Sequence, residues 1–109
     1  MKKESFHIIT DEEFQLFKGG NERIFRKIFN LYHQLLYRFA YSFTKCSFES
    51  EEAVQEAFII LYKATKSIKE PAQIYPYLIV ITKRTLIKSF RKKVSHAKYS
   101  NYLKFMWSE

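Results

Sequence analysis

A long stripe of large apolar side chains runs through residues 25–43. Its members recur at the i, i+3, i+4, i+7 spacing of an amphipathic helix, and they are Phe25, Ile28, Phe29, Tyr32, Leu35, Leu36, Phe39 and Phe43. Basic and amide residues fall mostly on the other side. Because the stripe is wide, the pattern predicts a long helix at the centre of a helical bundle. A ligand pocket lined by aromatic residues is the alternative interpretation, and a buried core is favoured over it.

A short helix is predicted before this stripe. Thr10 and Glu13 have the spacing of a capping box, in which each side chain accepts the other residue's backbone N–H. The helix is expected to continue through Lys18 and to stop at the Gly pair of residues 19–20, where glycine permits a left-handed C-cap. Asn21 is the predicted N-cap of the long helix.

A third helix with an acidic beginning follows a connection over residues 45–50. Ser50 is its predicted N-cap, which places Glu51 and Glu52 in the first turn, where carboxylates interact favourably with the helix dipole. The helix is expected to extend to about Ser67. Its predicted buried face consists of Ala53, Val54, Ala57, Phe58, Leu61 and Tyr62.

The last predicted helix begins after a loop with two prolines. Pro71 and Pro76 limit regular structure over residues 67–76, and Pro76 suits the first turn of the next helix. At ~100° per residue, two sets of side chains then fall on nearly opposite faces of that helix. The apolar set is Ile79, Leu86 and Phe90, and the basic set is Arg84, Lys88 and Arg91.

These elements together predict an all-α fold, a compact bundle of about four helices. Only two Gly and two Pro in 109 residues favour a few long helices over many short strands, and the length suits one domain. We expect a flexible N-terminal arm over residues 1–9 and a helical domain over residues 10–93. Residues 94–109 are expected to be a linker stub or a short extra helix.

The charge of the chain is concentrated near its C-terminal end. The net charge is +8, and residues 83–93 hold six of the nineteen Lys and Arg residues. A cationic helix face neutralises phosphates and releases their counterions, which supplies affinity without sequence preference. A solvated helix end is the alternative, because a helix C-terminus favours cations in any case. Six cations in eleven positions favour a surface that binds nucleic acid. Lys83 is expected to project toward the apolar side of the helix.

The residues that carry chemistry in enzymes form no recognisable pattern here. The single cysteine and three histidines show no metal-ligand spacing, and no arrangement of nucleophile, base and acid stands out. We therefore expect no metal, no cofactor and no enzymatic activity. No apolar run is long enough to span a bilayer, no signal-peptide core is present, and a cytoplasmic protein without a membrane partner is expected.

The order of these segments resembles region 2 of the sigma-70-family RNA polymerase sigma factors, of the extracytoplasmic-function type. The resemblance covers residues 10–93. It rests on Leu36-Tyr37, on the run Glu51-Glu-Ala-Val-Gln-Glu-Ala-Phe58, on Tyr77-Leu78, on Ile81 and on Arg91. The family's usual Trp is Tyr77 here, its Asn is Arg84 and its Asp is Lys88, so the family's base preference does not transfer.

The resemblance implies the partners and the residues that contact them. The third helix would dock on the clamp helices of the largest subunit of core RNA polymerase, through Glu51, Glu52, Gln55 and Glu56. The loop of residues 66–77 and the helix after it would hold bases flipped from the non-template strand of the promoter −10 element. The implied DNA contacts are Lys66, Lys69, Gln73, Tyr75, Tyr77, Lys83, Arg84, Lys88, Arg91, Lys92 and Lys93.

Alternatives remain for these residues. Glu51 and Glu52 would serve only the helix dipole if no polymerase binds, and Tyr77 suits the core as well as DNA, whereas Tyr75 leans toward DNA. An anti-sigma factor is a further candidate partner. A helical nucleic-acid-binding module without polymerase, and a protein-interaction module, are the competing functions.

Overall fold

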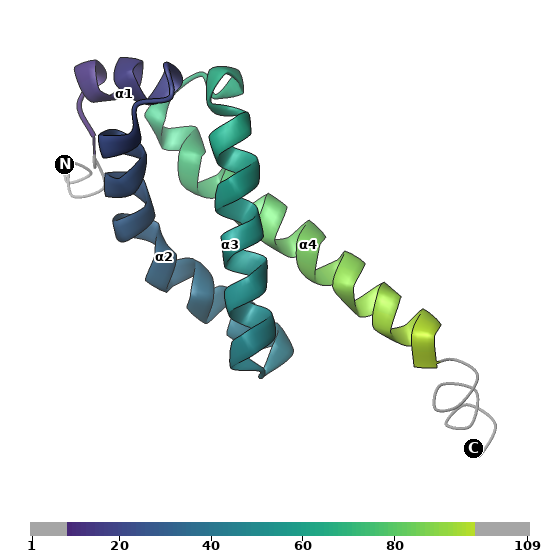
Figure 1. Ribbon diagram of the computed structural model, residues 1–109. Helices are drawn as coiled ribbons and strands as arrows, with labels where there is room; N and C mark the ends of the chain where they lie inside the picture. Colours follow the sequence, from purple (N-terminus) through teal and green to yellow (C-terminus); the bar gives the residue numbers. More distant parts are fainter. Residues whose placement is uncertain (1–8, 98–109) are drawn as a thin grey trace.

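The structure is a computed structural model, and it describes residues 9–97. Four α-helices make up most of this part: α1 (Asp11–Lys18), α2 (Glu22–Thr44), α3 (Ser47–Lys63) and α4 (Ile74–Ala97) (Figure 1). Two short 3-10 turns, η2 (Thr65–Ser67) and η3 (Pro71–Gln73), connect α3 to α4. No strand occurs between residues 9 and 97, and the predicted all-α bundle of four helices is confirmed.

The predicted helix boundaries around α1 are confirmed. The Thr10 hydroxyl accepts a hydrogen bond from the Glu13 N–H at 3.1 Å, and the Glu13 carboxylate accepts one from the Thr10 N–H at 3.0 Å. Gly20 has a φ of 84°, which is the left-handed conformation that ends α1. The Asn21 side chain then accepts the Ile24 N–H at 3.0 Å and caps α2. Local side-chain chemistry therefore sets this corner of the fold.

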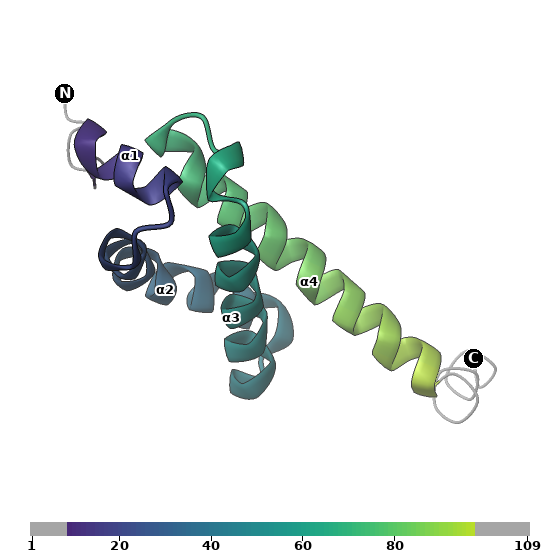
Figure 2. The ribbon, with the colours of Figure 1, turned by 45° about the horizontal axis from the view of Figure 1, so that its top comes forward.

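The core is formed by residues of α1, α2, α3 and α4, and Figure 2 shows how these helices are arranged. The stripe on α2 supplies Ile28 and Leu36, which are fully buried, with Phe25 and Phe29 packed against the Phe58 ring at centroid distances of 6.2 Å and 4.7 Å. The stripe is wider than the surface its neighbours cover. Two of its residues, Leu35 and Phe43, are therefore exposed by 46% and 60%. Tyr62, which was predicted for the buried face of α3, is 44% exposed.

The start of α3 differs from the prediction. The connection after α2 consists of Lys45, in a left-handed conformation, and Cys46, which is the N-cap. Ser50 is buried inside the helix, where its hydroxyl donates to the Cys46 carbonyl at 2.8 Å and lies 2.8 Å from the Thr44 Oγ1. Glu51 and Glu52 consequently lie in the second turn. The helix also ends at Lys63, before the predicted Ser67, because η2 tightens the chain there.

Ordered structure is described on both sides of residues 10–93. Ile9, assigned to the arm, is 8% exposed and belongs to the core. Helix α4 has Pro76 in its first turn as predicted, and continues past residue 93 to Ala97. Residues 1–8 and 98–109 lie outside the described range, so the remaining predictions for the arm and the C-terminal segment fall there. No helix in residues 9–97 is long and apolar enough to cross a membrane.

Candidate polymerase and nucleic-acid interface

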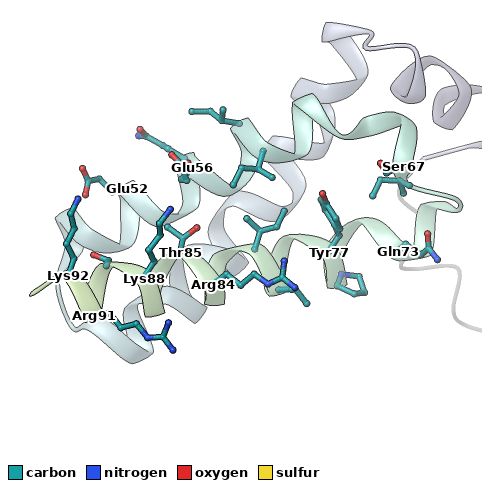
Figure 3. A pocket seen from close by; sticks show the side chains of 18 residues that line it. Glu52, Glu56, Ser67, Gln73, Tyr77, Arg84, Thr85, Lys88, Arg91 and Lys92 are labelled. Carbon is teal, nitrogen blue, oxygen red and sulfur yellow. The ribbon is translucent and has the colours of Figure 1, made fainter. Parts of the chain in front are cut away.

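A groove with a volume of about 1250 Å³ runs along the surface between α3 and α4 (Figure 3). Its apolar lining comes from Ile59 and Ile60 on α3 and from Val80 and Ile81 on α4. The polar and charged residues along its two sides include most of the predicted contacts. They are Glu52, Gln55, Glu56, Gln73, Tyr77, Arg84, Lys88, Arg91 and Lys92. The structure thus places predicted polymerase contacts and predicted DNA contacts on facing walls of one groove.

The α3 wall of the groove is acidic. Glu52, Gln55 and Glu56 are exposed, and their i, i+3, i+4 spacing keeps them on one face of the helix. Glu51 lies about 100° further round the helix. Its Oε2 is 3.1 Å from the His33 Nε2 on α2, and its side chain is 41% exposed. Glu51 therefore faces α2 and does not line the groove, although its side chain remains partly exposed.

The α4 wall of the groove is basic. Arg84, Lys88 and Arg91 are exposed at i, i+4 and i+7, with Lys92 beside them, which confirms that the predicted basic set shares one face. Figure 3 shows Lys88 and Lys92 extending from α4 toward the α3 wall. The wall therefore presents several cations along one line, as a phosphate backbone requires.

Two residues of the predicted basic stripe lie outside this groove. Lys83 and Lys93 line a second hollow of about 660 Å³, together with the apolar side chains of Phe43, Ile87 and Phe90. The Lys93 ammonium forms an ion pair with the Glu49 carboxylate on α3, and this hydrogen bond raises the pKa of Lys93 above its usual value. The stripe therefore divides, because residues 83–93 make three helical turns and cannot all face one side.

The loop between α3 and α4 lies at the end of the groove that Ser67, Gln73 and Tyr77 line. The Gln73 carboxamide oxygen accepts the Lys69 backbone N–H at 2.9 Å, which holds the loop together and occupies that oxygen. Lys66 and Lys69 are exposed. The loop thus offers cations and the Gln73 amide nitrogen near the groove.

Tyr75 and Tyr77 lie in the first turn of α4, and both pack against the core. Tyr75 packs on Tyr32 with ring centroids 4.9 Å apart, and burial raises the pKa of both phenols. Tyr77 is half-buried and lines the groove. The two rings thus differ in that Tyr75 contacts α2 and Tyr77 lines the groove, and a DNA contact by either one stays a prediction.

A comparison with protein families assigns the region that carries this groove. The family model described as Sigma-70 region 2 matches residues 28–95, more than half of the chain. The chain belongs to the sigma-70 region 2 family. Membership implies, in general, binding to core RNA polymerase and recognition of the promoter −10 element by a non-enzymatic transcription initiation factor. Comparisons with curated proteins and with solved structures gave no match.

The match spans α3, the loop and α4 as far as Ser95, so every predicted contact of the region 2 domain falls within it. Sequence reasoning missed the ion pair of Glu49 with Lys93 and the hydrogen bond between Glu51 and His33. Glu49 gave no signal, because the predicted α3 began after it. The shared groove was also missed, although Glu52 and Glu56, like Lys88 and Lys92, are four residues apart.

Proposed function

We propose that this region 2 domain, of the extracytoplasmic-function type, binds the clamp helices of core RNA polymerase through Glu52, Gln55 and Glu56. These side chains are exposed, share one face and offer two carboxylates and an amide to basic residues of a partner helix. Glu51 is left out of this contact set, because it is already paired with His33.

The opposite wall and the loop hold the opened −10 strand. Tyr77 lines the end of the groove near the loop, where an unpaired base can stack on its ring, and the Gln73 amide nitrogen is placed to read a base edge. The backbone of the strand follows the exposed cations of the loop and of α4, which are Lys66, Lys69, Arg84, Lys88, Arg91 and Lys92. Capture of flipped bases stabilises the melted promoter without any chemical step.

One observation carries this proposal: a single groove joins an acidic wall, a basic wall and an accessible tyrosine inside the matched family region. A helical module that binds nucleic acid alone would have no use for the acidic wall. A module that binds only proteins would have no use for the basic wall. The two walls therefore favour a function with both partners.

The first test is binding to purified bacterial core RNA polymerase. We expect Glu52→Lys/Gln55→Ala to weaken binding at least about tenfold, because interfacial charge pairs are worth one to several kcal/mol. Glu12→Lys/Gln15→Ala is the matched control, since it makes the same changes at the same spacing on exposed positions of α1. Equal binding by the two variants would remove polymerase from the proposal and leave a nucleic-acid module.

The second test concerns the strand. Tyr77→Ala should weaken binding of single-stranded −10-type oligonucleotides about tenfold, given that stacking of one base on an aromatic ring contributes about 1–3 kcal/mol. Tyr75→Ala should mainly lower the free energy of unfolding, because it removes the packing on Tyr32. The opposite pattern would return the stacking role to Tyr75.

A further inference from the structure

The two charged walls of the α3/α4 groove match each other in register. Helices α3 and α4 pack together and are connected through η2 and η3, so they run in opposite directions along the groove (Figure 1). Glu52 and Glu56 are four residues apart on α3, and Lys92 and Lys88 are four residues apart on α4 in the opposite chain direction. Glu52 therefore corresponds to Lys92, and Glu56 corresponds to Lys88. Each four-residue separation covers ~6 Å of helix axis. Figure 3 shows the Lys92 side chain extending toward Glu52 and the Lys88 side chain extending toward the wall that carries Glu56.

These facing charges form no direct ion pair. The charged contacts found in residues 9–97 are the ion pairs of Glu13 with Lys27 and of Glu49 with Lys93 and the hydrogen bond between Glu51 and His33, and none of them crosses the α3/α4 groove. Glu52, Glu56, Lys88 and Lys92 are all exposed. Their carboxylates and ammonium groups therefore remain accessible to other ligands, while each side lies in the field of the other.

That field acts directly on nucleic-acid binding. The Debye length is ~8–10 Å at physiological ionic strength, so charges on facing walls of one groove are only partly screened from each other. The apolar lining of Ile59, Ile60, Val80 and Ile81 adds low-dielectric material beneath them, which concentrates the field. A phosphate approaching Lys88 or Lys92 is attracted by the ammonium groups and repelled by the carboxylates opposite.

We propose that Glu52 and Glu56 are affinity-determining residues for nucleic acid, which weaken the binding of single strands to the basic wall of α4 in the free protein. This inference rests on the proposed function, because it gives a second role to residues assigned there to polymerase. A cationic partner that binds these two carboxylates cancels their field. Such a partner raises the affinity of α4 for a strand, and by thermodynamic linkage the strand raises the affinity for the partner.

The test compares two pairs of charge-neutralised variants of the full chain. The Glu52→Gln/Glu56→Gln variant and the Glu12→Gln/Glu22→Gln control each change the formal net charge from +8 to +10. Glu12 and Glu22 are exposed residues of α1 and the start of α2. Binding is measured by fluorescence anisotropy with a short labelled oligothymidine over a range of salt concentrations.

We expect the groove variant to bind the oligothymidine about tenfold more tightly than wild type at low salt, and the control about twofold or less. The salt dependence of the groove variant should be steeper by ~0.7 in log–log slope for each additional phosphate engaged. Near 1 M salt, where the Debye length is ~3 Å, the difference should vanish. An equal gain in both variants would overturn the inference, since it would show an effect of net charge alone.

A mutant cycle tests whether the carboxylates act through the facing lysines. Glu56→Gln should gain affinity in the wild-type background and lose that gain in a Lys88→Gln background. If Glu56→Gln still raised the affinity in the Lys88→Gln background, Glu56 would not act through Lys88. Failure of wild type and all variants to bind oligothymidine at low salt would overturn the DNA part of the proposed function, and this inference with it. Binding without any response at Glu52 and Glu56 would overturn the inference alone.

Discussion

The two halves of α4 have opposite surroundings although they form one continuous helix. In residues 74–82, Ile74, Leu78 and Thr82 are at most 2% exposed, whereas no residue in 83–93 is buried. Hydropathy alone does not produce this division. Phe90 is 63% exposed despite its apolar ring, and Thr82 is fully buried despite its hydroxyl. What decides burial is whether α2 and α3 lie against the helix at that position.

This division separates stability from binding within one element. The first half anchors α4 in the bundle, and the second half extends from it (Figure 1) and exposes most of the basic residues of α4. Substitutions of the buried residues in the first half should therefore change the free energy of unfolding. Substitutions in the second half should change affinity while the fold persists.

The largest expected effect is on the anchored half. Leu78→Ala should lower the free energy of unfolding by about 3 kcal/mol, because the lost packing leaves a cavity in the core. Ile87→Ala is the control in the projecting half, where the side chain is 47% exposed, and its effect should stay within about 0.5 kcal/mol. Urea denaturation followed by far-UV circular dichroism measures both. Similar losses for the two variants would show that the projecting half is also part of the core.

The next effect concerns the projecting half. Replacing Arg84, Lys88 and Arg91 by Glu should weaken single-strand binding about 100-fold at low salt and reduce the log–log salt slope by ~2. The free energy of unfolding should change by no more than about 0.5 kcal/mol. The matched control replaces three exposed arginines of α2 by Glu: Arg23, Arg26 and Arg38. Equal losses of affinity would mean that net charge, and not the α4 face, binds the strand.

A smaller gain is expected at the border between the halves. The Thr82 hydroxyl is buried with no hydrogen-bond partner, and burying such a group costs free energy. Thr82→Val keeps the shape and removes the hydroxyl, so the free energy of unfolding should rise by about 1 kcal/mol. Thr85→Val, at a half-exposed position lining the groove, should change it little. A loss of stability at Thr82 would indicate that its hydroxyl is satisfied in solution.

The smallest effect concerns the ion pair that ties the projecting half to α3. The pKa of Lys93 is raised first by its hydrogen bond to Glu49. The stabilisation that this pair gives to the end of α4 is therefore fully present below the ordinary lysine pKa. It is lost as pH rises through the raised pKa of Lys93. Lys93→Gln should shift the carbon chemical shifts of the last turns of α4 toward coil values, and high pH should do the same to wild type. Lys83→Gln, which lacks an ion pair, should shift them less.

The sequence by itself determined the helices and the features that act locally. The Thr10 and Glu13 capping box, the Gly20 turn and the Asn21 cap were all predictable, because each depends on contacts within a few residues. The shared face of Arg84, Lys88 and Arg91 followed from helical periodicity alone. The family could likewise be inferred from the order of short motifs, and the match over residues 28–95 confirms it at the level of region 2.

Other features were decided only by tertiary structure, because they depend on which elements meet. Ser50 looked like a helix cap, but packing against Thr44 made it an interior residue. Glu51 and Glu52 are neighbours in the chain, yet α2 binds the first and the groove leaves the second exposed. Tyr75 and Tyr77 are two residues apart, yet Tyr75 packs on Tyr32 of α2 and Tyr77 lines the groove. Periodicity assigns residues to faces of a helix, and only the packing of neighbouring helices determines which faces remain exposed.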